Sequence, residues 1–213
     1  MSDQINFTSA DYPWPEKNDK LFESGDDWWH NACLNYMRDS TELYIRGYKE
    51  AADALVTSPQ TTRGYQDFFI FPVAFLYRQY LELRLKDLIN TGNQLFHDQS
   101  NHLKTHDLLQ LWKTCKPLLI LLEPKIEQED IDAAEEAINQ FYRVDPTSQA
   151  FRYPFLRDGQ PAIPPDIRYI NLRNLAEIME KVSNFLDAGA QMMAVYLEYK
   201  QDMALEFKNA TDF

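Results

Sequence analysis

The fold class follows from residues 68–89, which read FFIFPVAFLYRQYLELRLKDLI. The first half is almost wholly apolar, and the second half carries Arg78, Glu82 and Lys86 at positions i, i+4 and i+8. That spacing places the three charges on one stripe of an α-helix whose other faces are apolar. The stretch therefore predicts a helix buried among neighbouring helices, with Pro72 marking its first turn or a kink.

Helix signals continue on both sides of this stretch. Upstream, Ser24, Asp26 and Asp27 are predicted to cap a first helix, which ends before Ser58-Pro59. The apolar positions on one face of that helix are Trp29, Cys33, Tyr36, Leu43, Tyr44, Ala51 and Leu55. Downstream, Gly92-Asn93 is a predicted stop signal for the second helix.

Two further helices are predicted in the middle of the chain. Thr105 is the expected N-cap of a third helix, which runs from Asp107 to about Leu122. Pro117 is expected to bend or split this helix. Pro124 and the acidic run 127–130 open a fourth helix.

The last part of the chain combines a long loop with a very long helix. Residues 145–166 contain five prolines and one glycine, which predict a stiff loop, with a short hairpin possible in 151–158. A final helix is predicted over 167–208. At about 1.5 Å per residue it would be about 60 Å long, more than a domain of this size can cover. Its C-terminal part is therefore expected to project or to pack against another chain.

The predicted fold is all-α: an up-and-down helical bundle of about five helices with a long C-terminal helix. Residues 1–26 are polar and show no helical period, so they are interpreted as an N-terminal arm over the domain surface. Residues 27–213 form the predicted bundle domain.

Composition narrows the possible functions. The chain of 213 residues has 21 Lys and Arg against 33 Asp and Glu, and this net charge of −12 disfavours general binding to DNA or anionic membranes. Six glycines and two cysteines disfavour glycine-rich phosphate loops and a disulfide framework. No secretory signal is visible, and the longest apolar run, 68–77, is far short of the roughly 20 residues of a membrane span. A cytoplasmic protein without a membrane partner is expected.

Metal, cofactor and nucleophile chemistry find little support. His102 and His106 have the spacing of two ligands on one helix face, but the predicted cap Thr105 lies between them. Cys33 and Cys115 have no cysteine neighbour, and the chain lacks a Gly-x-Ser-x-Gly elbow. No metal and no cofactor is expected, and no catalytic residue can be assigned.

Six residues form a candidate ligand pocket. Arg78 is interpreted either as a buried partner of Glu82 or as a group that faces a ligand. In the long loop, FRYPFLRDG (151–159) alternates aromatic rings with arginines, which could stack a base and hold a phosphate. Alternatively, the rings plug the bundle and the arginines pair with acidic helices. The candidate residues are Arg78, Glu82, His106, Asp107, Arg152 and Tyr153.

Three segments together resemble prokaryotic HEPN-domain proteins: YRQYLELRLKDLI (77–89), HDLLQLW (106–112) and FRYP (151–154). The resemblance covers roughly residues 67–200. It implies a helical bundle, a homodimer and a prokaryotic defence, toxin–antitoxin or regulatory setting. Many members are metal-independent ribonucleases that use an Arg followed, after four to six residues, by a His near the start of a late helix.

This chain departs from that ribonuclease motif. None of its four histidines follows an Arg at the required distance, and Ile178 stands where a His would complete the motif after Arg173. The leading hypothesis is therefore a non-catalytic, HEPN-like binding or regulatory protein that forms a homodimer and binds a basic protein partner. The alternative is a divergent ribonuclease or nucleotide-handling enzyme that takes RNA or a nucleotide at a local cationic pocket formed by Arg78, Glu82, His106 and Arg152.

Overall fold

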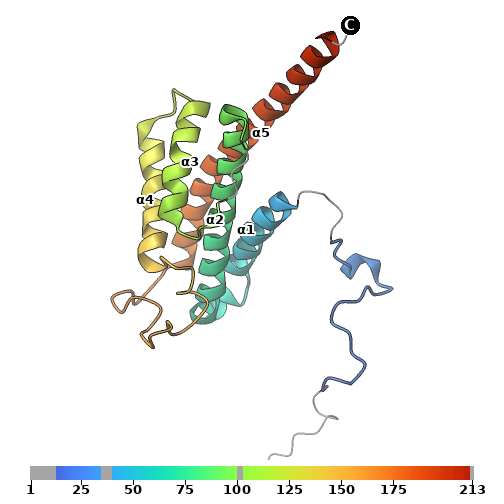
Figure 1. Ribbon diagram of the computed structural model, residues 1–213. Helices are drawn as coiled ribbons and strands as arrows, with labels where there is room; N and C mark the ends of the chain where they lie inside the picture. Colours follow the sequence, from blue (N-terminus) through green and yellow to red (C-terminus); the bar gives the residue numbers. More distant parts are fainter. Residues whose placement is uncertain (1–12, 35–39, 100–102, 212–213) are drawn as a thin grey trace, which may run out of the picture. The chain divides into compact units, whose positions relative to one another are not determined.

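The computed structural model confirms an all-α protein with a long C-terminal helix (Figure 1). It describes residues 13–34, 40–99 and 103–211. The chain divides into two units, Met1–Arg38 and Asp39–Phe213. The second unit contains the five α-helices, which are α1 (Thr41–Thr57), α2 (Gln66–His97), α3 (Leu108–Leu122), α4 (Gln128–Val144) and α5 (Leu172–Thr211), and a short 3₁₀ turn, η2 (Thr61–Arg63).

The predicted start of the first helix is wrong. The described part of the first unit has a single 3₁₀ turn, η1 (Trp28–His30), and α1 begins only at Thr41. Trp29 is 93% exposed and Cys33 is exposed as well. Burial of these side chains therefore does not stabilise a helix in this segment. Asn31 instead closes a local turn, because its side chain bonds both the backbone N–H and the carbonyl of Gly25.

The face that α1 buries matches the prediction at Leu55, which packs against the core, and differs at other positions. Ile45 and Ala52 are buried against the bundle, whereas Leu43 and Tyr44 are more than half exposed. Ala51, also predicted on this face, is exposed. Tyr36, another predicted member, lies outside the described residues.

The predicted stop at Gly92-Asn93 is wrong as well, because α2 continues to His97. Gly92 lies inside the helix at a close approach between elements. A Cβ there would meet Leu118 Cδ1 at 3.0 Å and Met193 Sδ at 3.3 Å. The glycine therefore makes room for α3 and α5, and α2 ends instead at Asp98, which is left-handed with φ 53°.

The cap of α3 is two residues later than the predicted Thr105. Asp107 is the N-cap, and its side chain accepts a hydrogen bond from the Gln110 backbone N–H at 3.0 Å. Thr105 instead accepts from the Asp107 N–H. Pro117 lies inside α3 without splitting it. The described part of the 145–166 loop has an isolated bridge between Phe155 and Pro161 and no named strand.

Helix α2 forms the centre of the bundle, as its apolar sequence predicts. It packs against α1, α3 and α5, while α4 completes the bundle against α3 and α5. Its buried apolar residues lie on about half of the helix circumference and are Val73, Ala74, Tyr77, Tyr80, Leu81, Leu85, Leu88 and Ile89. Burying each large side chain of this kind is worth about 1.5–3 kcal/mol.

Helix α5 extends beyond the helices that cover it. It starts at Leu172, because Asn171 Oδ1 accepts a hydrogen bond from the Asn174 backbone N–H at 3.1 Å. Met193 is fully buried, and none of the described side chains after it on α5 is buried. Figure 1 shows this C-terminal part running away from the other helices, so the predicted projection is present.

Candidate functional site

Arg78 is the centre of a buried polar cluster that joins α2 to the segments before α3 and after α4. Its side chain is fully buried. Nη1 donates to Glu82 Oε2 at 3.1 Å, and Nη2 donates to the His106 carbonyl at 2.9 Å. Nε donates to the Asp145 carbonyl at 3.2 Å and lies 3.3 Å from Asp145 Oδ2. Of the two sequence interpretations of Arg78, this geometry corresponds to the ion pair with Glu82.

Glu82 connects this buried cluster to the surface. Its side chain is 2% exposed, and its Oε1 accepts hydrogen bonds from Lys86 Nζ at 2.8 Å and from His106 Nδ1 at 2.7 Å. Burial alone would raise the pKa of Glu82, but the bonds from Lys86 and His106 outweigh it and hold the pKa below its usual value. The His106 ring is 69% exposed, so with Nδ1 on Glu82 its Nε2 is the nitrogen left for other groups.

Asp145 belongs to this cluster and was not predicted from the sequence. Its Oδ1 accepts from the backbone N–H groups of Gln149 at 2.7 Å and Ala150 at 3.0 Å, and so builds the turn that leads into the long loop. A buried arginine needs more than one acceptor. In the sequence, the aspartate directly before Pro146, at the end of the predicted fourth helix, was the feature that could have indicated Asp145 as the second acceptor.

Arg152 and Tyr153 lie beside this cluster rather than in it. The Arg152 guanidinium stacks on the rings of Phe75 and Tyr153 at 5.8 and 5.6 Å, within the range of cation–π attraction. Together with Gln149, Phe155, Leu156 and Arg157, these two residues line a shallow hollow of about 370 Å³.

The six candidate residues therefore separate into two groups. Arg78, Glu82 and His106 share hydrogen bonds, while Asp107 caps α3 and has a structural role. Arg152 is linked to the first group only through the turn after Asp145, since its Nε donates to the Ser148 carbonyl.

A second polar network, centred on Arg84, was not predicted. Its guanidinium is 5% exposed and pairs with Asp187 at 2.7 Å, Glu42 at 2.9 Å and Asp87 at 3.0 Å. The Tyr80 hydroxyl donates to Asp187 at 2.7 Å. Burial and the Asp187 carboxylate raise the pKa of Tyr80. This network joins α1, α2 and α5.

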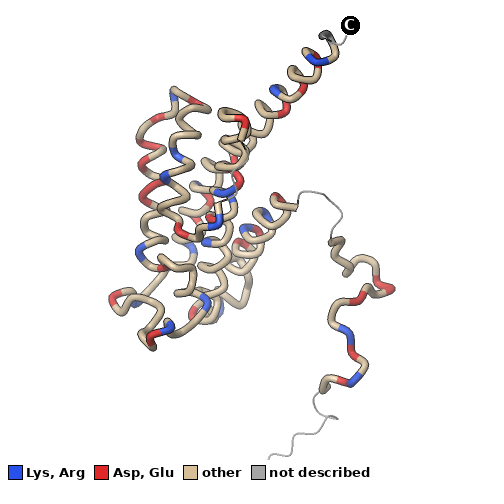
Figure 2. Tube along the Cα trace, viewed as in Figure 1, with Lys and Arg blue, Asp and Glu red and all other residues tan. Residues whose placement is uncertain are grey.

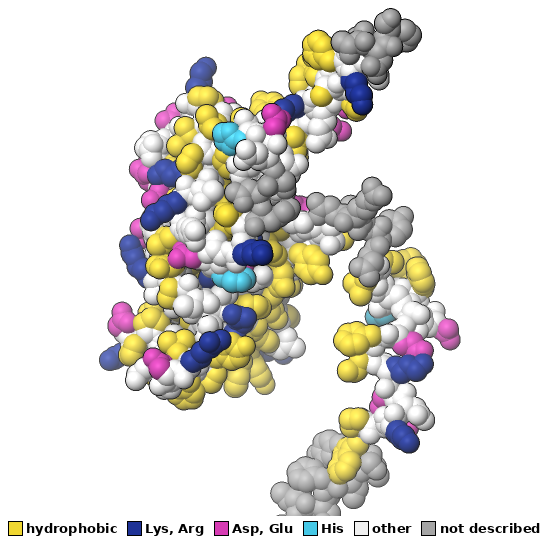
Figure 3. Space-filling model, viewed as in Figure 1, with side chains coloured by type: hydrophobic (Ala, Val, Ile, Leu, Met, Phe, Trp, Pro, Cys, Tyr) yellow, Lys and Arg dark blue, Asp and Glu magenta, His cyan; other side chains and the backbone are white. Residues whose placement is uncertain are grey.

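Charges of both signs are mixed along the helices (Figure 2), whereas exposed apolar side chains gather at one end of the bundle (Figure 3). Asp and Glu residues lie along α1, α2, α4 and α5, with Lys and Arg between them (Figure 2). Apolar side chains gather over the end of the bundle formed by the start of α2 and the long loop (Figure 3). At this end Tyr65, Phe68, Tyr153 and Phe155 are more than half exposed.

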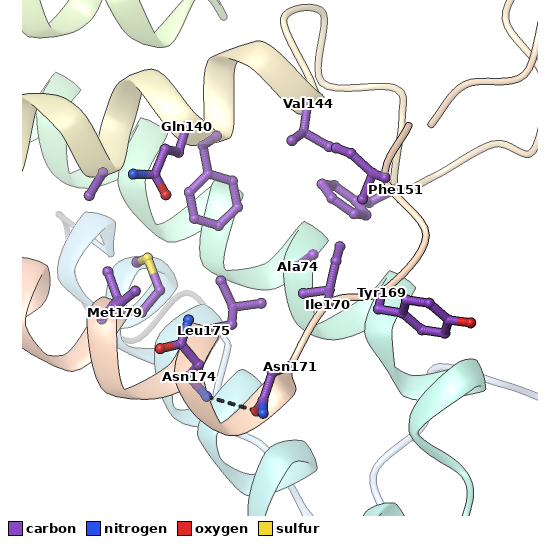
Figure 4. A pocket seen from close by; sticks show the side chains of 14 residues that line it. Ala74, Gln140, Val144, Phe151, Tyr169, Ile170, Asn171, Asn174, Leu175 and Met179 are labelled. Atoms are coloured by element: carbon purple, nitrogen blue, oxygen red, sulfur yellow. Dashed lines mark hydrogen bonds between the residues drawn. The ribbon is translucent and has the colours of Figure 1, made fainter. Parts of the chain in front are cut away.

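A cavity between α4 and α5 is a further concave feature that the sequence did not indicate. Its volume is about 280 Å³, and α2 and the end of the long loop complete its walls (Figure 4). Ala74 and Met179 are each 1% exposed and form part of its buried floor. The ring of Tyr169 is 94% exposed and points away from it.

Several kinds of site are not found in the described parts of the chain. Residues 13–34, 40–99 and 103–211 contain no group of three His, Cys, Asp or Glu side chains that could hold a metal ion. None of the helices in these ranges is long and apolar enough to cross a membrane. Burial raises the pKa of the Cys115 thiol, which makes it a poor nucleophile.

Comparison with known proteins adds no family or function to the all-α fold class. No family model matches the chain, and neither curated proteins nor solved structures give a significant match.

Proposed function

We propose that this chain is a non-catalytic, HEPN-like helical protein that acts through binding and forms a homodimer. The observation that carries the proposal is the apolar stripe on the uncovered end of α5. This stripe consists of Tyr196, Tyr199 and Met203, which share one helix face at spacings of three and four. Tyr196 is 49% exposed and Tyr199 is 65% exposed.

The length of uncovered helix supports a partner for this stripe. The helix from Ala194 to Thr211 is 18 residues, or about 27 Å at about 1.5 Å per residue. None of its described side chains is buried, and Lys200 bonds the end of α2. In proteins, most helical stability comes from packing of an amphipathic face. A second copy offers the same stripe, so two α5 ends related by a two-fold axis would cover one another.

The remaining parts of the proposal concern partners and setting. The net charge of −12 favours a basic protein over a nucleic acid as the further partner. The resemblance to HEPN-domain proteins suggests a prokaryotic defence or toxin–antitoxin-type system.

Sedimentation velocity over a range of protein concentrations tests the dimer. We expect the native chain to be dimeric at micromolar concentration and Tyr199→Glu to be monomeric, because the new carboxylate would be buried without a partner. Gln201→Glu adds the same charge on the opposite side of the helix and should leave the dimer unchanged. A native chain that stays monomeric at high concentration would refute the proposal.

A second candidate function is favoured by one specific contact. His106 presents an exposed ring whose Nδ1 is held by the buried Glu82 carboxylate, next to the ammonium group of Lys86. A histidine oriented in this way can move a proton at a ribose 2′-hydroxyl, and a nearby cation can stabilise a phosphate. This arrangement suits a divergent metal-independent ribonuclease that binds RNA or a nucleotide.

A cleavage assay on a mixed RNA pool separates the two candidates. The enzyme hypothesis predicts cleavage that is lost in His106→Ala and retained in His97→Ala, which removes an exposed histidine at the end of α2. Both variants should keep the native circular dichroism spectrum. An intact RNA pool with the native protein would reject the ribonuclease and leave the binding protein.

A further inference from the structure

We propose that the cavity between α4 and α5 binds a neutral, largely apolar small molecule that carries one amide-like hydrogen-bonding group. The site lies in the bundle domain and does not involve the polar cluster around Arg78 or the uncovered end of α5. It therefore stands or falls independently of the homodimer and of ribonuclease activity.

The floor and walls of the cavity are apolar. Ala74 from α2, Phe141 from α4 and Met179 from α5 are all at least nine-tenths buried and converge with Phe151 of the long loop. Ile170 and Ile178 form the rim and are 36% and 37% exposed. A buried floor with a partly exposed rim is the arrangement of a binding cleft, and about 280 Å³ is close to the lower end of the roughly 300–1,000 Å³ usual for ligand sites.

The polar groups of the cavity are amides. None of the described residues that line it is charged, and its polar members are Gln140, Asn171 and Asn174. Figure 4 places the Gln140 side chain on the α4 side and that of Asn174 on the α5 side. A charged ligand group would find no ionic partner among these lining residues, whereas an amide can exchange hydrogen bonds with them.

Two of these amides have hydrogen-bonding capacity to spare. The Asn174 side chain has no hydrogen-bond partner among the described residues, and Gln140 uses its amide nitrogen for Glu136 Oε1 at 3.1 Å, which leaves its carbonyl oxygen. Asn171 Oδ1 is already used to cap α5. An amide on the ligand can donate to Gln140 and accept from Asn174, which defines the chemical class.

A neighbouring hollow differs from this cavity in having charged side chains in its lining. That hollow, of about 530 Å³, shares Phe151, Ile167, Tyr169 and Ile170 with the cavity. It also contains Asp67 and Arg168, so a charged ligand would have partners there but not between α4 and α5.

Isothermal titration calorimetry with three probes of equal chain length tests the proposal. Octanamide, octanoate and octylammonium differ in the charge of the head group. We expect saturable one-to-one binding of octanamide, and binding at least about tenfold weaker for both ions. No saturable binding of octanamide, or equally tight binding of either ion, would overturn the proposal.

Matched variants locate the binding. Ala137→Phe introduces a ring at a residue that lines the cavity, whereas Ala133→Phe introduces the same ring one turn earlier at an exposed position of α4. Octanamide binding should fall at least tenfold in the first variant and stay unchanged in the second. Asn174→Leu should weaken octanamide about tenfold by removing its hydrogen-bond partner.

Folding controls keep this experiment decisive. The thermal midpoint and circular dichroism spectrum of each variant show whether it is native. If Ala137→Phe is not, Ile178→Trp blocks the cavity from its exposed rim and serves in its place. Native affinity in a folded blocking variant would show that octanamide binds elsewhere and would overturn the assignment.

Discussion

Arg78 shows how one side chain can join three parts of the bundle domain. Its guanidinium donates to a carboxylate on its own helix and to carbonyls of His106 and Asp145 on either side of the α3–α4 pair. Without the guanidinium, Glu82 Oε2 and the two carbonyls would lose this donor in a buried place. The arginine is therefore required for stability whether or not the neighbouring His106 has a chemical role.

Removing this guanidinium should be strongly destabilising. We expect Arg78→Ala to lower the free energy of unfolding by about 3–5 kcal/mol, because the carboxylates of Glu82 and Asp145 stay buried without their partner. Arg46→Ala is the control, since Arg46 and Glu50 form an exposed pair with both side chains 67% exposed; its effect should be within about 1 kcal/mol. Urea denaturation measures both, and similar values for the two variants would contradict the expected role of Arg78.

Glu82 should make the stability of the protein depend on pH. Its folded pKa lies below the ordinary value, so the carboxylate form is the one that the folded state favours. The stabilisation is complete above the unfolded pKa of about 4.3 and is lost as the pH falls through the folded value. We therefore expect Glu82→Gln to be less stable than the native chain at pH 7, with the difference shrinking below about pH 4.

Urea denaturation of both proteins between pH 7 and pH 3.5 measures that difference. Glu50→Gln, which alters an exposed ion pair, should show a small difference throughout this range. A gap between native protein and Glu82→Gln that widens towards low pH would have the wrong sign for a depressed carboxyl pKa.

At the scale of elements, two helical glycines should respond in opposite ways to replacement by alanine. Gly47 in α1 is exposed, and a Cβ there would have nothing within 4 Å, whereas a Cβ at Gly92 in α2 would lie 3.0–3.3 Å from Leu118 and Met193. Gly47→Ala should stabilise the protein by about 0.5–1 kcal/mol through helix propensity. Gly92→Ala should destabilise it by about 1–2 kcal/mol, because overpacking outweighs the same propensity gain.

Thermal denaturation measures both effects. The midpoint should rise for Gly47→Ala and fall for Gly92→Ala. The magnitude expected for a domain of this size is about 2–4 °C per kcal/mol. An increase in the midpoint for Gly92→Ala would mean that Leu118 and Met193 can move apart at little cost, and that close approach is not why α2 tolerates a glycine.

The elements that could be predicted from sequence are those whose apolar residues are buried in the bundle. The apolar positions of α2, α3 and α4 are covered by other helices, so helical periodicity reports their packing directly. Trp29 and Cys33 fit the same periodicity but are exposed, and without burial the pattern has no energetic consequence. The end of α2 was misjudged because Gly92 serves helix packing rather than a turn.

The candidate site was predictable only where its contacts are local. Arg78 and Glu82 are four residues apart on one helix, so their spacing indicates the ion pair. The carbonyls of His106 and Asp145 are 28 and 67 residues away from Arg78 in the sequence. The cavity between α4 and α5 likewise combines side chains from three helices and a loop. Contacts between residues so far apart in the sequence depend on tertiary packing, which the periodicity of apolar residues does not encode.

At the scale of the bundle domain, α5 performs two separable tasks. Its first half is part of the core, with Met179, Leu186 and Met193 buried. Lys200 then fixes the helix to the end of α2, because its ammonium group donates to the carbonyl of Leu95 at 2.7 Å and to Asp98 Oδ1 at 2.6 Å. These contacts also satisfy a C-terminal carbonyl of α2, which has no partner within its own helix. Beyond Lys200 the helix supplies surface rather than core.

Removing residues 201–213 should therefore weaken association without unfolding the bundle. The truncated chain keeps Lys200 and, among the residues of α5 whose burial is described, all the buried ones, so we expect its thermal midpoint to stay within about 2 °C of the native value. It loses Met203 from the apolar stripe and the exposed Leu205 and Phe207, so the apparent dissociation constant of the dimer should rise at least tenfold, as measured by sedimentation velocity. A truncated chain that still dimerises with native affinity would place the dimer interface elsewhere on the bundle. A large fall in its thermal midpoint would instead show that the end of α5 contributes to the fold.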